Sequence, residues 1–309
     1  MERRVIIIAG PTASGKSDIA FQLARELNTE IISADSRQVF RHLNIGAAKP
    51  PAEYLSVVRH HFIDSHELDQ PFDAGAFEVE ALEIITALHK ENKIPIVCGG
   101  SGLYIRALLN GIIDIEPDYA IRTTLQQKRE ALGDQAMYDL LKEIDPFAAS
   151  GMTPRNYNRV LRALEVYYIT GKPISEVHTA YQRSSEIEFH EYGTLWDRAE
   201  LYARINSRVL GMIEAGLVEE VRGIIANGYS PSLNGLNTVG YKEIISFLYD
   251  EITLERAIAL IQRNTRHYAK RQLTWFKKDQ EIQWLPVSSS SALSDISGKI
   301  YSDIVNCVH

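Results

Sequence analysis

The sequence predicts an α/β protein in which a phosphate-loop parallel sheet is flanked by helices and carries a helical insertion domain. Short β-branched runs alternate with helical patterns through the first 117 residues, and a glycine-rich loop follows the first of these runs. Strands interleaved with helices favour a parallel sheet that is covered on both faces. Helical patterns then predominate between residues 118 and 184. We therefore predict a core of residues 1–117 and 185–309, with residues 118–184 inserted into it.

The elements of the core follow from hydrophobic periodicity. A first strand over Arg4–Gly10 precedes a helix over Lys16–Leu27, in which apolar residues recur at helical spacing. Further strands are expected at Glu30–Asp35, His61–Asp64, Ile94–Cys98 and Phe189–Trp196. Core helices are expected at Phe77–Glu91, Arg198–Glu214, Leu217–Asn227 and Leu254–Lys278, and the low-complexity stretch Ser288–Ala292 is expected to be a loop. The insertion should contain helices at Arg122–Leu132, Tyr138–Ile144 and Asn156–Thr170.

Composition excludes several classes of protein. No apolar run reaches the roughly 18 to 20 residues that a membrane span needs, so we expect a cytoplasmic protein without a membrane anchor, and a monomer. Cys98 and Cys307 are the two cysteines, too few for a disulfide framework or a cysteine zinc site. The net charge of −7 and pI near 5.8 argue against a generally basic coat. Any nucleic-acid binding must therefore come from a local patch.

A phosphate-loop motif lies between the first strand and the first helix. Its eight residues are Gly10, Pro11, Thr12, Ala13, Ser14, Gly15, Lys16 and Ser17. Glycines let the backbone curl so that N–H groups and a helix N-terminus face one anion, while Lys16 adds a charge and Ser17 a hydroxyl for Mg²⁺. The alternative is a glycine-rich turn that happens to end in Lys-Ser. The motif predicts a diphosphate or polyphosphate site and does not specify a nucleotide.

A basic face is predicted on the helix near the C-terminus. Between Gln262 and Lys278 there are six Lys/Arg residues and His267 but no Asp or Glu, and the cations share one side of a helical projection. The opposite side is largely apolar, and Trp275 lies near the boundary. This pattern favours a polyanionic partner, with an aromatic ring to stack on a base. The alternative is a solvated helix face with Trp275 in the core.

A second, weaker basic group and a candidate base complete the residues of interest. Arg155, Arg159 and Arg162 share a helix face, on which Glu165 can simply pair with Arg162. Asp35 ends the second predicted strand, 19 residues after Lys16, where carboxyl ends of parallel strands open onto one crevice. It is a candidate general base. Its alternatives are a helix N-cap or a carboxylate that orders Mg²⁺.

The sequence resembles the tRNA dimethylallyltransferases (isopentenyl-diphosphate:tRNA transferases). The resemblance covers nearly the whole chain in family order and rests on these stretches: Gly10–Ser17, Asp35–Gln38, Asn44–Pro50, Gly99–Tyr104, Asn158–Glu165, Gly171–Pro173, Gly216–Val221 and Ala269–Phe276. It implies transfer of a dimethylallyl group from its diphosphate to N6 of the adenosine 3′ of the anticodon, in tRNAs that read codons beginning with U. Ala47 departs from the family, which more often has Thr there.

The resemblance also implies partners and residue roles. The partners are a tRNA anticodon stem-loop and dimethylallyl diphosphate, with Mg²⁺ as cofactor. The phosphate loop and Lys16 would hold the diphosphate, Asp35 would act as the base on the adenine amine, and Ser101 would touch the target nucleotide. The tRNA-contacting positions would be Asp35, Ser36, Arg37, Gln38, Ser101, Arg122, Asn158, Arg159, Val160, Leu161, Arg162, Lys270, Arg271, Gln272, Leu273, Thr274 and Trp275.

Two further arginines and three rival functions stay open at this point. Arg204 and Arg208 are candidates for diphosphate binding, although surface helix cations are an equal interpretation. A phosphate-loop small-molecule kinase would use Asp35 on a hydroxyl and ATP as donor, but leaves the basic helix unexplained. An adenylate isopentenyltransferase shares the chemistry with less need for an RNA clamp. A non-catalytic RNA-binding switch would have no need of the base candidate.

Overall fold

The computed structural model describes residues 3–112, 115–180 and 186–306. Its contacts divide the chain into two compact units, residues 1–109 with 185–309 and residues 110–184. Each unit has its own apolar core. The second unit therefore begins at Asn110 rather than at Asp118, where the sequence placed the start of the insertion.

The first unit is built on a six-stranded sheet in the order β3-β2-β4-β1-β5-β6, in which every pair of neighbours is parallel. The strands are β1 (Arg3–Ala9), β2 (Ile31–Ala34), β3 (His60–His61), β4 (Ile96–Gly99), β5 (Ile187–Trp196) and β6 (Gln283–Val287). The middle of β1 is a continuous apolar run that is fully buried, as expected for a strand covered on both faces. The predicted α/β fold class is confirmed.

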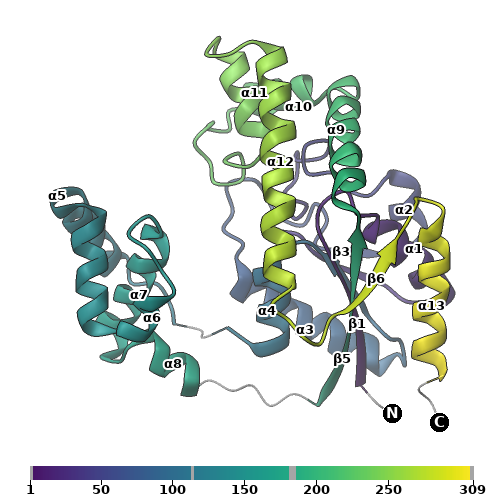
Figure 1. Cartoon of the computed structure of the whole chain (residues 1–309), viewed down its shortest axis with the longest axis horizontal. Helices are drawn as coiled ribbons and strands as arrows, with labels where there is room; N and C mark the ends of the chain where they lie inside the picture. The colour runs from purple at the N-terminus through teal and green to yellow at the C-terminus, as the bar shows by residue number, and fades with distance from the viewer. Residues whose placement is uncertain (1–2, 113–114, 181–185, 307–309) are drawn as a thin grey trace. The chain divides into compact units, whose positions relative to one another are not determined.

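Helices cover the sheet and extend beyond its carboxyl edge. They are α1 (Lys16–Glu26), α2 (Ala52–Val57), α3 (Ala74–Lys90), α4 (Gly102–Asn110), α9 (Arg198–Glu214), α10 (Leu217–Ala226), α11 (Tyr241–Leu248), α12 (Leu254–Phe276) and α13 (Ala292–Asn306). Helices α1 and α13 pack together, and α9 to α12 form one group into which β5 leads directly (Figure 1). This group stands over the ends of the strands, where the candidate site lies.

The second unit is wholly helical in its described part. It consists of α5 (Tyr119–Ile144), α6 (Pro146–Ser150), α7 (Tyr157–Thr170) and α8 (Ile174–Ala180), with Leu125, Leu141 and Leu164 in its core. The two helices predicted at Arg122–Leu132 and Tyr138–Ile144 lie within α5, which is interrupted at Gly133 by non-helical dihedrals (φ 84°, ψ 167°). Glycine adopts a positive φ with little strain, so the chain bends there.

Several elements differ from the sequence-based expectation. The strand predicted at His61–Asp64 is wrong beyond His61, because Phe62 and Asp64 have positive φ values (60° and 53°) that end the extended chain. Helix α3 starts earlier than predicted because Asp73 caps it, accepting hydrogen bonds from the N–H groups of residues 75 and 76. Elements α4, α11, β6 and α13 were not predicted. The loop expected at Ser288–Ala292 ends where α13 begins.

None of the helices in the described ranges combines the length and the apolar character needed to cross a membrane.

One buried carboxyl group in the sheet makes the stability of the fold depend on pH. Glu191 lies on β5 and is 9% exposed, and its Oε2 has no hydrogen-bond partner among the described residues. Burial, with the nearby charges of Asp279 and Glu281, raises the pKa of Glu191 from 4.5 to about 7. The folded protein therefore favours the protonated form of this side chain.

We predict that Glu191→Gln stabilises the protein at alkaline pH and not in acid. Below the unfolded pKa of 4.5, Glu191 is protonated in both states, whereas rising pH ionises the unfolded chain first and withdraws stability until the folded pKa of about 7 is passed. Urea unfolding should show the variant about 2 kcal/mol more stable than wild type near pH 8, and equally stable near pH 4. Glu188→Gln, on the same strand but with a half-exposed side chain, is the control. A variant of Glu191 with no pH-dependent difference would contradict the prediction.

Candidate functional site

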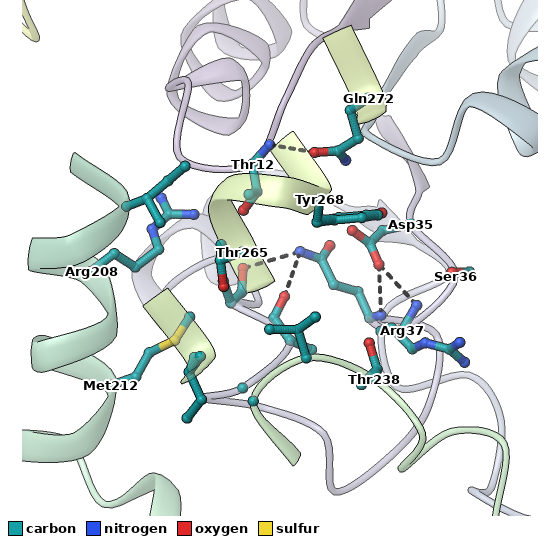
Figure 2. A pocket seen from close by; sticks show the side chains of 18 of the residues that line it. Thr12, Asp35, Ser36, Arg37, Arg208, Met212, Thr238, Thr265, Tyr268 and Gln272 are labelled. Atoms are coloured by element: carbon teal, nitrogen blue, oxygen red, sulfur yellow. Dashed lines mark hydrogen bonds between the residues drawn. The ribbon is translucent and has the colours of Figure 1, made fainter. Parts of the chain in front are cut away.

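The register of the sheet brings three chain segments to one place. Ala9 of β1 and Ala34 of β2 both pair with Gly99 of β4, so the three strands end at the same level. The phosphate loop, the turn that starts at Asp35 and the segment that starts at Gly100 therefore leave the sheet side by side. A cavity of about 350 Å³ lies there, bounded also by α9, α12, residues 46–48 and residues 237–240 (Figure 2).

The phosphate loop has the geometry of an anion cradle. Gly15 has φ 83° and is the N-cap of α1, which begins at Lys16. Donors on β5 and α9 bind the carbonyl oxygens of the loop: Trp196 Nε1 donates to Ser14 O at 2.8 Å and Arg204 Nε to Ala13 O at 2.9 Å. The N–H groups of residues 13–17 have no hydrogen-bond partner in the part of the chain that the structure describes. They are free to bind an anion at the helix N-terminus.

Lys16 and Ser17 line the cavity next to these N–H groups. Lys16 Nζ donates to Pro11 O at 3.1 Å. Burial lowers the pKa of Lys16, and the charges of Cys98 and Asp35 partly oppose that shift. Because burial of the ammonium group is unfavourable in itself, an anion bound beside Lys16 would stabilise its charged form.

Asp35 forms the turn after β2 and also faces the cavity. Its Oδ1 accepts hydrogen bonds from Arg37 N at 2.8 Å and Gln38 N at 3.4 Å, as the capping alternative foresaw. Its Oδ2 has no hydrogen-bond partner among the described residues. The turn thus orients the carboxylate through one oxygen and leaves the other for a ligand (Figure 2).

Ser101 lies beside this turn and does not line the cavity. Its Oγ accepts a hydrogen bond from Ser36 N at 3.1 Å, and its own N–H donates to Ala34 O at 3.2 Å. In this arrangement Ser101 positions the Asp35 turn. A direct contact of Ser101 with a nucleotide stays a prediction.

Residues 44–48 form a wall of the cavity that sequence reasoning left without a holder. Glu220 on α10 accepts hydrogen bonds from the N–H groups of Asn44, Ile45 and Gly46 at 3.1, 2.7 and 3.2 Å, and from Tyr241 Oη at 2.7 Å. Burial and the Glu220 charge raise the pKa of Tyr241, which keeps its hydroxyl proton for this bond. Three successive N–H groups on one carboxylate fix the loop. Only the family stretch Gly216–Val221 pointed to this region.

An apolar wall faces the phosphate loop. Ile205, Val209 and Met212 come from one face of α9, and Ile261 comes from α12. The three α9 residues have helical spacing, which indicates a packed face but not what it meets. This wall was missed because the approach of α9 to α12 is a tertiary contact.

The two candidate arginines on α9 have different places. Arg208 lines the cavity, with Lys16 and Asp35 on the same wall list of groups that shape its charge. Arg204 instead binds the outside of the phosphate loop, donates to Ser290 Oγ at 2.5 Å and stacks its guanidinium 4.3 Å from the Trp196 ring centre. Of the two, only Arg208 can reach a ligand in the cavity directly.

Helix α12 presents its cations outward, as predicted. Ala257, Ile261, Ala269, Gln272 and Phe276 are its buried residues. No cation between Arg263 and Lys278 forms an ion pair with a carboxylate of the described chain, and Trp275 is 41% exposed. An open hollow of about 440 Å³ on this face is lined by His267, Lys270, Arg271, Thr274, Trp275 and Lys278. Gln272 turns inward and Leu273 is partly buried, unlike these neighbours.

The predicted RNA-contacting residues of the insertion are divided between its surface and its core. Asn158 and Arg159 are exposed, Leu161 is partly buried, and Val160 lies in the core with 1% exposure. Glu165 is buried and accepts hydrogen bonds from Arg122 Nε at 2.6 Å and from an Arg162 guanidinium nitrogen at 2.7 Å. The pairing of Arg162 with Glu165 is thus present, and it draws in Arg122 as well.

The fold and the cavity define a phosphate-loop α/β enzyme with a cationic helix beside its site. A family model described as IPP transferase matches residues 38–279. A tRNA dimethylallyltransferase 1 from Pelobacter propionicus is 45% identical over 91% of this chain and 92% of its own, and a tRNA dimethylallyltransferase from Alkaliphilus metalliredigens is 43% identical over 94% of both. The chain belongs to the IPP transferase family.

Solved structures agree with this assignment. The tRNA isopentenylpyrophosphate transferase from Bacillus halodurans has a TM-score of 0.71 at 36% identity, covering 98% of this chain and 97% of its own. A eukaryotic dimethylallyltransferase acting on tRNA has a TM-score of 0.82 at 28% identity, covering 98% of this chain and 78% of its own. The family, the enzyme class and the main function expected from the sequence are confirmed, and nothing supports the kinase or the adenylate isopentenyltransferase.

We predict that Glu220→Gln loosens the loop at residues 44–48. The amide offers one acceptor oxygen where the carboxylate offers two, and its NH₂ group faces N–H donors, at a cost of about 1 to 3 kcal/mol. Native-state hydrogen exchange at Asn44, Ile45 and Gly46 should accelerate at least about tenfold. Glu219→Gln, one residue earlier with a side chain that is 71% exposed, should leave these rates unchanged. Equal protection in both variants would show that Glu220 does not hold the loop.

Proposed function

We propose that this protein transfers the dimethylallyl group of dimethylallyl diphosphate to N6 of the adenosine 3′ of the anticodon, in tRNAs that read codons beginning with U. The observation that carries the proposal is the placement of Asp35, whose free carboxylate oxygen shares one cavity with the phosphate loop. Membership of the family supports the same reaction. The phosphate loop then holds a diphosphate rather than a nucleotide.

The cavity suits both ends of such a donor. Free N–H groups of residues 13–17 and the ammonium of Lys16 provide donors and charge for a diphosphate. Ile205, Val209, Met212 and Ile261 provide an apolar surface for a branched five-carbon group. Arg208 adds a second cation on the phosphate side.

The residues present fit a Mg²⁺ ion that is bound largely through the donor. Mg²⁺ prefers oxygen ligands and keeps several waters, so that one or two protein oxygens and the phosphates suffice. The Ser17 hydroxyl lines the cavity beside Lys16 and is the protein oxygen that we assign to this ion. When bound, Mg²⁺ offsets the negative charge that develops on the leaving diphosphate.

Transfer needs a base because the lone pair of an adenine amine is delocalised into its ring. Asp35 Oδ2 takes the proton from N6 as the new N–C bond forms and the bond between the allylic carbon and the diphosphate oxygen breaks. Its Oδ1 stays bound to the backbone of the turn and orients the carboxylate. Lys16 and the loop N–H groups stabilise the departing diphosphate.

The RNA partner is held by the exposed cations of α12. An anticodon adenosine must leave its stack to reach Asp35, and the unpaired cations with Trp275 at their edge can bind phosphates and stack on an unstacked base. Arg159 and Asn158 on the surface of the insertion are further candidates for RNA contact.

We predict that Asp35→Asn keeps both substrates bound but slows transfer by about 10² to 10⁴-fold, since a neutral amide cannot accept the proton. Single-turnover transfer of labelled dimethylallyl groups to an unmodified anticodon stem-loop measures the effect. Asp197→Asn is the matched control, because Asp197 also accepts two backbone N–H groups, at 2.8 and 3.4 Å, but lies outside the cavity. Wild-type rates for Asp35→Asn would remove the base assignment and with it the proposed chemistry.

We predict that a double reversal, Lys270→Glu with Arg271→Glu, weakens RNA binding and flattens its dependence on salt. Each lost phosphate contact removes released counterions, so the slope of log K against log salt should fall by about 1 per contact. Affinity for pyrophosphate should stay unchanged. Lys90→Glu with Lys299→Glu changes the net charge equally on exposed parts of α3 and α13 and is the control. If both pairs act alike, α12 has no special role in RNA binding.

A further inference from the structure

The side chain of Gln272 joins α12 to the phosphate loop. It is 6% exposed, although Lys270 and Arg271 immediately before it are exposed. Its Oε1 accepts a hydrogen bond from Thr12 N at 2.9 Å, and its Nε2 donates to Gly100 O at 2.9 Å (Figure 2). Both ends of one amide are therefore used to connect three chain segments.

The same helix fits closely against the segment after β4. A Cβ atom on Gly100 would lie 2.3 Å from Gln272 Nε2, and one on Gly102 would lie 2.2 Å from Trp275 Cδ1. Ser101, between these glycines, bonds the turn that carries Asp35. A displacement of this part of α12 must therefore move the phosphate loop or the Gly100–Gly102 segment with it.

One helical turn thus faces two ligands. Lys270, Arg271 and Trp275 line the outer hollow, whereas Gln272 reaches the loop on the inner side. Gln272 also occupies the N–H of Thr12, which leaves the N–H groups of residues 13–17 for the diphosphate. The position of α12 hence decides which loop N–H groups a diphosphate meets.

We propose that Gln272 is a positioning residue through which RNA binding on the outer face of α12 strengthens diphosphate binding in the loop. RNA that holds α12 in place also holds the Gln272 bonds, so the donor binds a loop that is already ordered. By linkage, the donor must strengthen RNA binding by the same factor. The inference rests on the proposed function, since it requires both ligands at their assigned places.

The test compares affinities measured with one ligand and with both. Calorimetry gives the Kd of pyrophosphate alone and with a saturating unmodified anticodon stem-loop RNA, and the Kd of the RNA with and without pyrophosphate. For the wild type we expect each ligand to tighten the other by about fivefold or more. In Gln272→Ala each ligand still binds alone, and the factor falls to about one.

Two further variants separate coupling from folding. Gln272→Glu keeps an acceptor for Thr12 N–H but places an oxygen against Gly100 O, so the factor should fall between those of wild type and Gln272→Ala. Gln262→Ala removes a bond from the same helix to Asn206 O at 3.3 Å, away from the loop, and should retain the wild-type factor.

The outcomes are distinct. A wild-type factor near one, or an unchanged factor in both Gln272 variants, overturns the coupling while leaving the proposed function intact. Failure of the wild type to bind the RNA at all overturns the proposed function itself. A factor that falls equally in Gln262→Ala shows a general loosening of α12 and also overturns the specific role of Gln272.

Discussion

The level at which three parallel strands end is the constraint on which the site depends. Gly99 pairs with both Ala9 and Ala34, and a Cβ atom on Gly99 would lie 2.1 Å from Ala34 O. Only glycine allows this approach without moving a strand. As a result, the anion-binding loop, the carboxylate of Asp35 and the Gly100–Gly102 segment emerge together. The chemistry requires no long-range movement of these groups, because the sheet already places them.

Helix α12 completes the site from above, and its amphipathic sequence serves two purposes. Its apolar side packs on the core, while its cations remain free of the carboxylates of the described chain. A helix with a free cationic face in a protein of net charge −7 concentrates positive potential next to the cavity. The loop at residues 44–48, held by Glu220, forms the opposite wall. Donor and RNA surfaces are thereby built on neighbouring sides of one rigid frame.

Local patterns predicted most of the core strands, the phosphate loop and the orientation of α12, because each is set by residue spacing within a few turns. They failed where tertiary contacts decide. The Glu220 bonds to residues 44–46 join positions about 175 residues apart, and those of Gln272 to Thr12 span 260 residues. Gln272 was taken for an RNA contact because its neighbours are basic, but burial turns it inward. Strand β6 and helix α13 were missed behind a serine-rich stretch that suggested only a loop.

Competitive binding to the phosphate loop tests the central claim most directly. Dimethylallyl diphosphate and ATP would each be titrated with Mg²⁺ into the wild type and into Lys16→Ala. The account predicts that dimethylallyl diphosphate binds the wild type more tightly than ATP and that Lys16→Ala loses this binding. Tighter binding of ATP, with transfer of its terminal phosphoryl group, would contradict it.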